Sequence, residues 1–139
     1  MSHQDHNAAA HADLTKNQTL VFGALSKADG PLSAYTILDQ LRGAGFRAPL
    51  QVYRALGKLV EIGIVHRLES LNAFVACRHP HCDSRDTIAF TICEACDRVA
   101  EINDGRLERS LKLLAEKGGF ALSKSTVELR GLCLECQAV

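Results

Sequence analysis

Two Cys-x-x-Cys pairs constrain the fold of this chain more than any other feature of its sequence. Cys93 and Cys96 form the first pair, and Cys133 and Cys136 form the second. Each pair places two thiolates on one backbone turn, and two pairs supply the four sulfur ligands of a tetrahedral zinc site. Because such a site has no open position, we expect a structural zinc ion. The alternatives are a redox disulfide and free buried thiols.

The sequence features that report on location favour the cytoplasm. Residues 1–13 lack the basic start and apolar stretch of a secretory signal, and the chain contains no apolar run of about 18 residues. We therefore expect no membrane association, and cysteines that bind metal rather than form disulfides. We expect residues 1–13 to be a loose tail, and we assign no role to its histidines, His3, His6 and His11.

Charge is unevenly distributed although its total is zero. The chain has sixteen basic and sixteen acidic residues. Residues 42–67 nevertheless contain five basic side chains against Glu61 alone, and all six cysteines lie at or after Cys77. This separation predicts two small domains with different chemistry. The five basic residues are Arg42, Arg47, Arg54, Lys58 and Arg67.

The predicted order of elements in residues 14–78 is three helices and then a hairpin. Apolar side chains recur at helical spacing in three segments, and Thr15 and Ser33 are suited to cap the first two helices. The order is typical of a winged helix-turn-helix domain. We expect helices at 14–28, directly after Ser33, and at 49–62, and strands at 64–68 and 73–77.

The third predicted helix has the chemistry of a DNA-recognition helix. Gln51, Arg54 and Lys58 lie off its apolar stripe, and such side chains suit adenine, guanine and phosphate respectively. Tyr35 and Tyr53 are placed where an aromatic ring could contact sugars or thymine methyl groups. The alternative is a solvated basic face that binds nothing.

After residue 86 the pattern changes to strand, strand, helix, strand, which makes the whole chain α+β. The strands are expected at 88–92, 98–102 and 125–132, with Asp104 as the cap of the helix. A unit of about 50 residues is short for a self-sufficient core and needs a metal ion, a partner subunit or both. The stripe that this helix is expected to bury is Leu107, Leu111, Leu114 and Ala115.

A second group of potential ligands spans the boundary between the two predicted domains. A metal site built from them would favour one arrangement of the domains, as a sensor requires. Mixed nitrogen, sulfur and oxygen ligands suit zinc. His66 alone is better explained as an ordinary surface histidine, whereas the whole set favours a metal site. The group is His66, Cys77, His79, His81, Cys82, Asp83, Asp86 and Glu101.

Over residues 14–139 the sequence resembles the ferric uptake regulator family, in its zinc-responsive branch. The resemblance implies a dimeric, metal-dependent repressor with a winged-helix domain at 14–78, a hinge at 79–85 and an α/β dimerisation domain at 86–139. One departure is KNQ at 16–18, where the family usually has Pro-Gln-Arg. The segments that carry the resemblance are SAY (33–35), VYRAL (52–56), GIVHRLES (63–70), the two cysteine pairs, GFAL (119–122) and GLCLEC (131–136).

The resemblance also implies roles for individual residues. Tyr35 and Arg54 are expected to approach DNA bases, and the four paired cysteines to hold structural zinc. A regulatory zinc ion, the second in each subunit, is expected at the hinge. Its fourth position is Asp86, where close relatives have histidine, and His79 and His81 are competing candidates. The expected regulatory ligands are His66, Cys77, Asp86 and Glu101.

The expected function is a cytoplasmic, zinc-dependent, homodimeric repressor that binds double-stranded operator DNA of zinc-acquisition genes when the hinge site is filled. Apart from the metal ion, no small-molecule substrate is expected. The alternatives are a sensor of another metal or of peroxide within the family, a zinc-ribbon interaction module, and a zinc hydrolase with Glu101 as base. The sequence lacks an HExxH pattern, which disfavours the enzyme.

Overall fold

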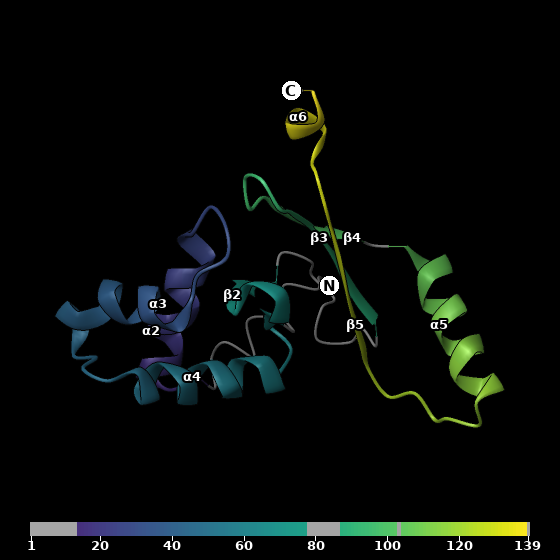
Figure 1. Cartoon of the computed structure of the whole chain (residues 1–139). Coiled ribbons are helices and arrows are strands. Elements are labelled where there is room, and N and C mark those ends of the chain that lie inside the picture. Colours follow the sequence, from purple (N-terminus) through teal and green to yellow (C-terminus); the bar gives the residue numbers. More distant parts are fainter. Residues whose placement is uncertain (1–13, 78–86, 103, 139) are drawn as a thin grey trace, which may run out of the picture. The chain divides into compact units, whose positions relative to one another are not determined.

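The chain forms two compact units, Met1–Ser84 and Arg85–Val139 (Figure 1). The computed structural model describes residues 14–77, 87–102 and 104–138. No helix within these ranges is long and apolar enough to cross a membrane. Several sequence predictions fall outside the described residues, namely the tail 1–13, the hinge 79–85, and the ligand candidates His79, His81, Cys82, Asp83 and Asp86.

Three helices open the first unit, as the sequence predicts. The Thr15 hydroxyl caps the first helix by accepting the Gln18 N–H at 3.2 Å. The Ser33 hydroxyl caps the second by accepting the Thr36 N–H at 3.1 Å. Each cap satisfies a backbone donor that a helix start otherwise leaves unpaired. The helices are α2 (Lys16–Lys27), α3 (Ala34–Leu41), which continues into a 3-10 turn at Arg42–Ala44, and α4 (Pro49–Glu61).

A two-stranded hairpin, the wing, follows α4 and confirms the predicted winged-helix order. Its antiparallel strands are β1 (Val65–Leu68) and β2 (Ala73–Ala76). A 3-10 turn at Glu69–Leu71 joins them, and it ends at Asn72, whose φ of 48° lies in the left-handed region. Asparagine tolerates this conformation better than most residues do. The wing is therefore a tight hairpin with locally suitable turn chemistry.

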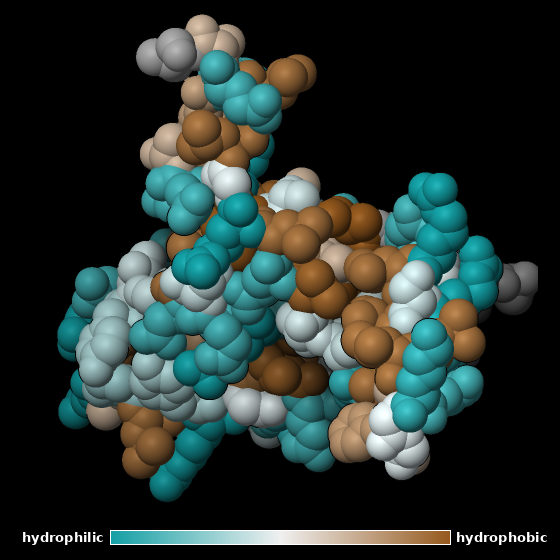
Figure 2. Space-filling view, turned by 45° about the vertical axis from the view of Figure 1, so that its right-hand side comes forward, coloured by the Kyte–Doolittle hydropathy of each residue, from teal (hydrophilic) through white to brown (hydrophobic). Residues whose placement is uncertain are grey.

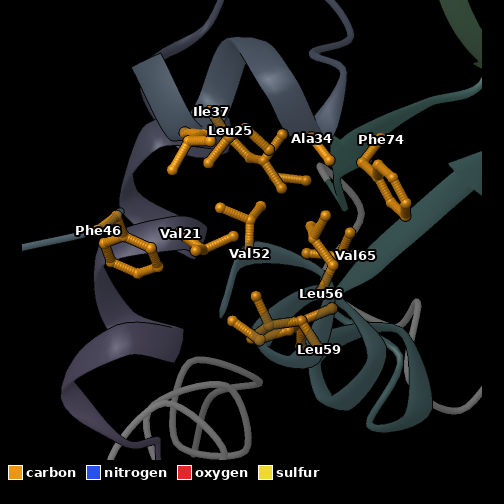
Figure 3. Packing of buried hydrophobic residues seen from close by; sticks show 14 residues of the cluster. Val21, Leu25, Ala34, Ile37, Phe46, Val52, Leu56, Leu59, Val65 and Phe74 are labelled. Atoms are coloured by element: carbon orange, nitrogen blue, oxygen red, sulfur yellow. The ribbon is translucent and has the colours of Figure 1, made fainter. Parts of the chain in front are cut away.

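The core of the first unit gathers the apolar stripes of the helices against the wing (Figure 3). Val52, Leu56 and Leu59 of α4 are all fully buried. Burying a side chain of this size contributes about 1.5–3 kcal/mol. This packing orients α4, so that its opposite face points to solvent. The other labelled members of the core are Val21, Leu25, Ala34, Ile37, Phe46, Val65 and Phe74.

A three-stranded sheet with the order β4-β3-β5 forms the second unit. The central strand pairs antiparallel with β4 and parallel with β5. Parallel pairing requires a long crossover, which α5 supplies. The sequence predicts all three strands but not this pairing. The elements are β3 (Thr87–Cys93), β4 (Val99–Ile102), α5 (Gly105–Lys117), β5 (Ser125–Gly131) and the short helix α6 (Leu134–Gln137), which the sequence analysis does not predict.

Helix α5 begins as predicted but does not bury its apolar stripe. Asp104 caps it by accepting the Arg106 N–H at 2.9 Å. However, α5 has no buried residue, and Leu114 is 68% exposed. The predicted burial of this stripe is wrong for the single chain, because so small a unit does not supply a second layer to cover the helix. Exposed apolar side chains appear in brown among hydrophilic ones in Figure 2.

Candidate metal centre and nucleic-acid interface

The four paired cysteines form one cluster in the second unit, as predicted. Their sulfur atoms all lie within 4.8 Å of one another. Strand β3 ends at Cys93, and the turn that follows carries Cys96. The parallel register places Cys93 opposite Gly131 at the end of β5, from which the chain continues to Cys133 and Cys136. The β3–β5 pairing therefore brings the two cysteine pairs together at one edge of the sheet.

The electrostatics of the cluster favour a bound dication. The Cys133 backbone N–H, 3.4 Å from the Cys93 sulfur, is the main cause that lowers the pKa of Cys93 to about 6. Conversely, the sulfurs of Cys133 and Cys93 raise the pKa of Cys136 to about 12. Four thiolates repel one another at these separations unless a cation lies among them. Four sulfur donors within 4.8 Å of one another fit a zinc ion.

Backbone hydrogen bonds shape the turn in each cysteine pair. In the first, the Asp97 N–H donates to the Cys93 carbonyl at 2.9 Å, and Asp97 has a φ of 62°. In the second, the Cys136 N–H donates to the Cys133 carbonyl at 3.0 Å. Backbone hydrogen bonds therefore fix the turn of each cysteine pair.

Two of the predicted regulatory ligands lie together on the wing. The donor atoms of His66 on β1 and of Cys77, which directly follows β2, are within 4.8 Å of each other. Burial lowers the pKa of His66 to about 4, so its imidazole is neutral, as a metal ligand must be. The Cys77 sulfur is part of a disulfide, so the expectation that the cysteines bind metal rather than form disulfides is wrong for Cys77 in this structure. Cys77 can ligate metal only after reduction. Glu101 lies on β4 of the second unit.

The outward face of α4 carries most of the predicted DNA-contacting residues. Arg54 and Lys58 are exposed, and Tyr53 is 40% exposed. Tyr35 projects from the first turn of α3 and is 62% exposed. Arg54 lines a shallow polar depression of about 270 Å³ together with residues from the start of α2, such as Asn17. These cationic and aromatic groups are accessible to a large ligand.

Gln51 has a local role that the sequence analysis misses. Its side-chain carbonyl accepts the backbone N–H groups of Arg47 at 2.7 Å and Ala48 at 3.0 Å. Gln51 is the third residue of α4, and a glutamine there commonly reaches back to the helix start. Its carbonyl oxygen therefore secures the entry to α4 in this structure. Because Pro49 marks the start of the helix, the position of Gln51 two residues later could have predicted this capping role.

Comparison with known proteins finds relatives of this chain among regulators of metal uptake. Residues 13–130 match the model of the ferric uptake regulator family. The zinc uptake regulation protein of Escherichia coli (strain K12) is 41% identical over 133 residues, which cover 95% of this chain and 77% of that protein. The zinc uptake regulation protein of Mycobacterium tuberculosis (strain ATCC 25618 / H37Rv) is 27% identical over 94% of this chain and 99% of its own length.

Solved structures of zinc uptake regulators also resemble this chain. A zinc uptake regulator complexed with zinc and DNA superposes with a TM-score of 0.85 at 37% identity, covering 99% of this chain and 97% of that one. The holo XcZur crystal structure has a TM-score of 0.80 at 40% identity, with 91% of this chain and 87% of that chain covered. The chain therefore belongs to the ferric uptake regulator family, in its zinc uptake regulator branch, and is a transcriptional regulator rather than an enzyme.

Proposed function

We propose that this chain is a cytoplasmic, zinc-dependent, homodimeric repressor of zinc-acquisition genes. The observation that carries the proposal is the likeness, over 99% of the chain, to a zinc uptake regulator complexed with zinc and DNA. The cationic face of α4 and the four-cysteine cluster supply the two chemistries that such a protein needs. The relatives named for zinc favour this metal over the other metals or peroxide considered for the family.

The DNA-binding surface would be built from α4 and the start of α3. Arg54 and Tyr35 would contact base edges, while Lys58 would contact phosphate. Tyr53 would add apolar contact beside them. Gln51 would contribute only through its amide nitrogen, because its carbonyl oxygen already accepts two backbone donors.

Dimerisation would involve the second unit. Its apolar surface supports this, since Leu113 is 59% exposed and Leu114 on the same helix is more so. A unit this small is expected to complete its core with a second copy and with metal. The four-cysteine zinc ion would hold the sheet edge in shape for that pairing.

In the reduced protein, the sensing zinc ion would use His66, Cys77, Asp86 and Glu101, with His79 or His81 as the replacement for Asp86. His66 and Cys77 support this assignment because their donor atoms already lie within 4.8 Å. Switching DNA occupancy almost fully requires a ~10⁴-fold preference for the binding form, about 5.5 kcal/mol. Zinc binding on the order of 10 kcal/mol is large enough to supply it.

Selection of duplex DNA tests the proposal without requiring the operator sequence in advance. A random duplex library is enriched on the zinc-loaded protein, and the affinity for the selected DNA is then measured with zinc or with chelator. We expect tight binding only with zinc, and a large loss for Arg54→Ala but not for Arg109→Ala, which removes an exposed cation on α5. Equal binding with and without zinc would contradict the proposal.

A further inference from the structure

An ion pair joins the two turns that carry the zinc-binding cysteines. The Arg98 guanidinium donates to the Glu135 carboxylate through both terminal nitrogens, Nη1 to Oε1 at 3.4 Å and Nη2 to Oε2 at 3.1 Å. Arg98 stands two residues after Cys96, and Glu135 stands between Cys133 and Cys136. The pair therefore connects residues that belong to different cysteine turns.

The pair is two-pronged and joins residues 37 positions apart, whereas the two-pronged pair of Arg106 with Asp104 lies within one turn. Parallel N–H···O bonds between an arginine and a carboxylate fix relative orientation as well as distance. The backbone of Arg98 is held too, because its carbonyl accepts the Cys93 N–H at 2.9 Å. Arg98 is thus anchored to the first turn by its main chain and to the second by its side chain.

The charge of Arg98 also suits its position. Four thiolates outweigh the two charges of a zinc ion, so a loaded site remains anionic. The guanidinium of Arg98, two residues after Cys96, offsets part of that charge.

Opening of the cysteine cluster must separate the two turns. The sulfurs of Cys96 and Cys133 are 3.8 Å apart, so zinc can leave only after one turn withdraws from the other or an incoming ligand displaces a sulfur. The first route requires the turns to move relative to each other. The ion pair opposes that movement, because both of its hydrogen bonds must break first.

We propose that Arg98 and Glu135 form a clasp that slows zinc release from the four-cysteine site. The two residues act as positioning residues, since they hold the ligands without contacting the metal. The inference rests on zinc occupancy of this site, as proposed above. It predicts that removing either charge has the same effect, because the clasp fails when either half is missing.

The test measures zinc transfer from the full-length protein to an excess of a chromogenic chelator. All variants carry Cys77→Ser, so that the regulatory site is empty and one zinc ion per subunit remains. Arg98→Gln and Glu135→Gln each replace a charge with a neutral side chain of similar reach. We expect each to speed zinc release by about threefold, the size typical of a well-formed surface pair, and the double variant to be no faster than either.

Arg106→Gln is the matched control. It breaks an exposed ion pair with Asp104, 3.0 Å long, in the same unit, and we expect an unchanged rate of zinc release. High salt screens exposed charges. It should therefore raise the rate of zinc release from the protein with the intact ion pair to nearly the rate of the variants.

Each outcome decides between different claims. Equal release rates for all variants would overturn the clasp, as would effects of Arg98→Gln and Glu135→Gln that multiply in the double variant. An effect of Arg98→Gln alone would mean that the cation acts directly on the sulfurs, which also overturns the clasp. Absence of zinc from the background protein would instead contradict the proposed structural zinc site.

Discussion

The backbone N–H of Cys133 points at the sulfur of Cys93 across 3.4 Å, although 40 positions separate the two residues in the sequence. The contact exists because β3 and β5 run parallel, with Cys93 opposite Gly131. One strand pairing thus decides both the shape of the sheet and the position of the candidate metal centre. Loss of the metal should therefore destabilise the fold of the second unit.

Cys136→Ser should unfold the second unit and leave the first intact. The substitution removes one of four ligands, and structural zinc of this kind contributes on the order of 10 kcal/mol of folding free energy. The core of the first unit lies entirely within residues 14–76 and contains none of the paired cysteines. Zinc content and circular dichroism check the result. Cys136→His, which keeps a zinc ligand, should retain metal, and a folded, metal-free Cys136→Ser protein would contradict the assignment.

The left-handed backbone at Asp97 predicts an unusual response to substitution. Because its φ is 62°, Asp97→Gly should leave the melting temperature unchanged or raise it. Asp97→Val should lower the stability of the zinc-loaded protein by about 1–2 kcal/mol. Asn72 in the wing also has a positive φ, of 48°, so we expect Asn72→Gly and Asn72→Val to change stability in the same directions. If the valine and glycine variants were equally stable at both positions, neither turn would require a left-handed backbone.

Leu56→Ala should destabilise the first unit by about 3 kcal/mol, since it creates a cavity beneath α4. Leu50 on the same helix is 57% exposed, so Leu50→Ala should cost less than about 0.5 kcal/mol. Denaturant unfolding followed by circular dichroism compares the two. Similar losses at both positions would mean that α4 is oriented differently from the packing in Figure 3.

Gln51→Ala and Arg54→Ala should separate a structural role from DNA recognition. Gln51→Ala removes the acceptor of two backbone N–H groups and should lower stability by about 1 kcal/mol. Arg54→Ala should leave stability nearly unchanged but weaken binding to selected DNA by about 1–3 kcal/mol and relax sequence preference. Thermal melts and binding titrations on the same two proteins give both quantities. A stable Gln51→Ala variant with altered base preference would reverse this division of roles.

Local sequence signals predicted much of the first unit. Thr15 and Ser33 are good caps, Pro49 is favoured in a first turn, and the stripe through Val52 and Leu56 has helical period, so each helix start is encoded within a few residues. The four-cysteine cluster was equally predictable, because the spacing of the cysteines is itself a metal-binding pattern.

Features that depend on distant residues were not predictable in the same way. The parallel pairing of β3 with β5 depends on the α5 crossover, and nothing in either strand alone specifies it. The stripe through Leu111 and Leu114 has the period of a buried helix, but period does not tell whether the covering surface belongs to the same chain. A glutamine can read a DNA base or cap a helix. Only the hydrogen bonds of the Gln51 side chain in the structure show that it caps α4.

A single titration can follow zinc content and DNA binding together. Reduced protein and its Cys77→Ser variant are titrated with zinc, and zinc stoichiometry and affinity for the selected DNA are measured at each step. We predict that the unmodified protein binds two zinc ions per subunit and gains DNA affinity with the second. Cys77→Ser should keep its fold and one zinc ion, and bind DNA weakly at every zinc concentration. If the one-zinc Cys77→Ser protein bound DNA as tightly as the unmodified protein, the second zinc ion would not control DNA binding.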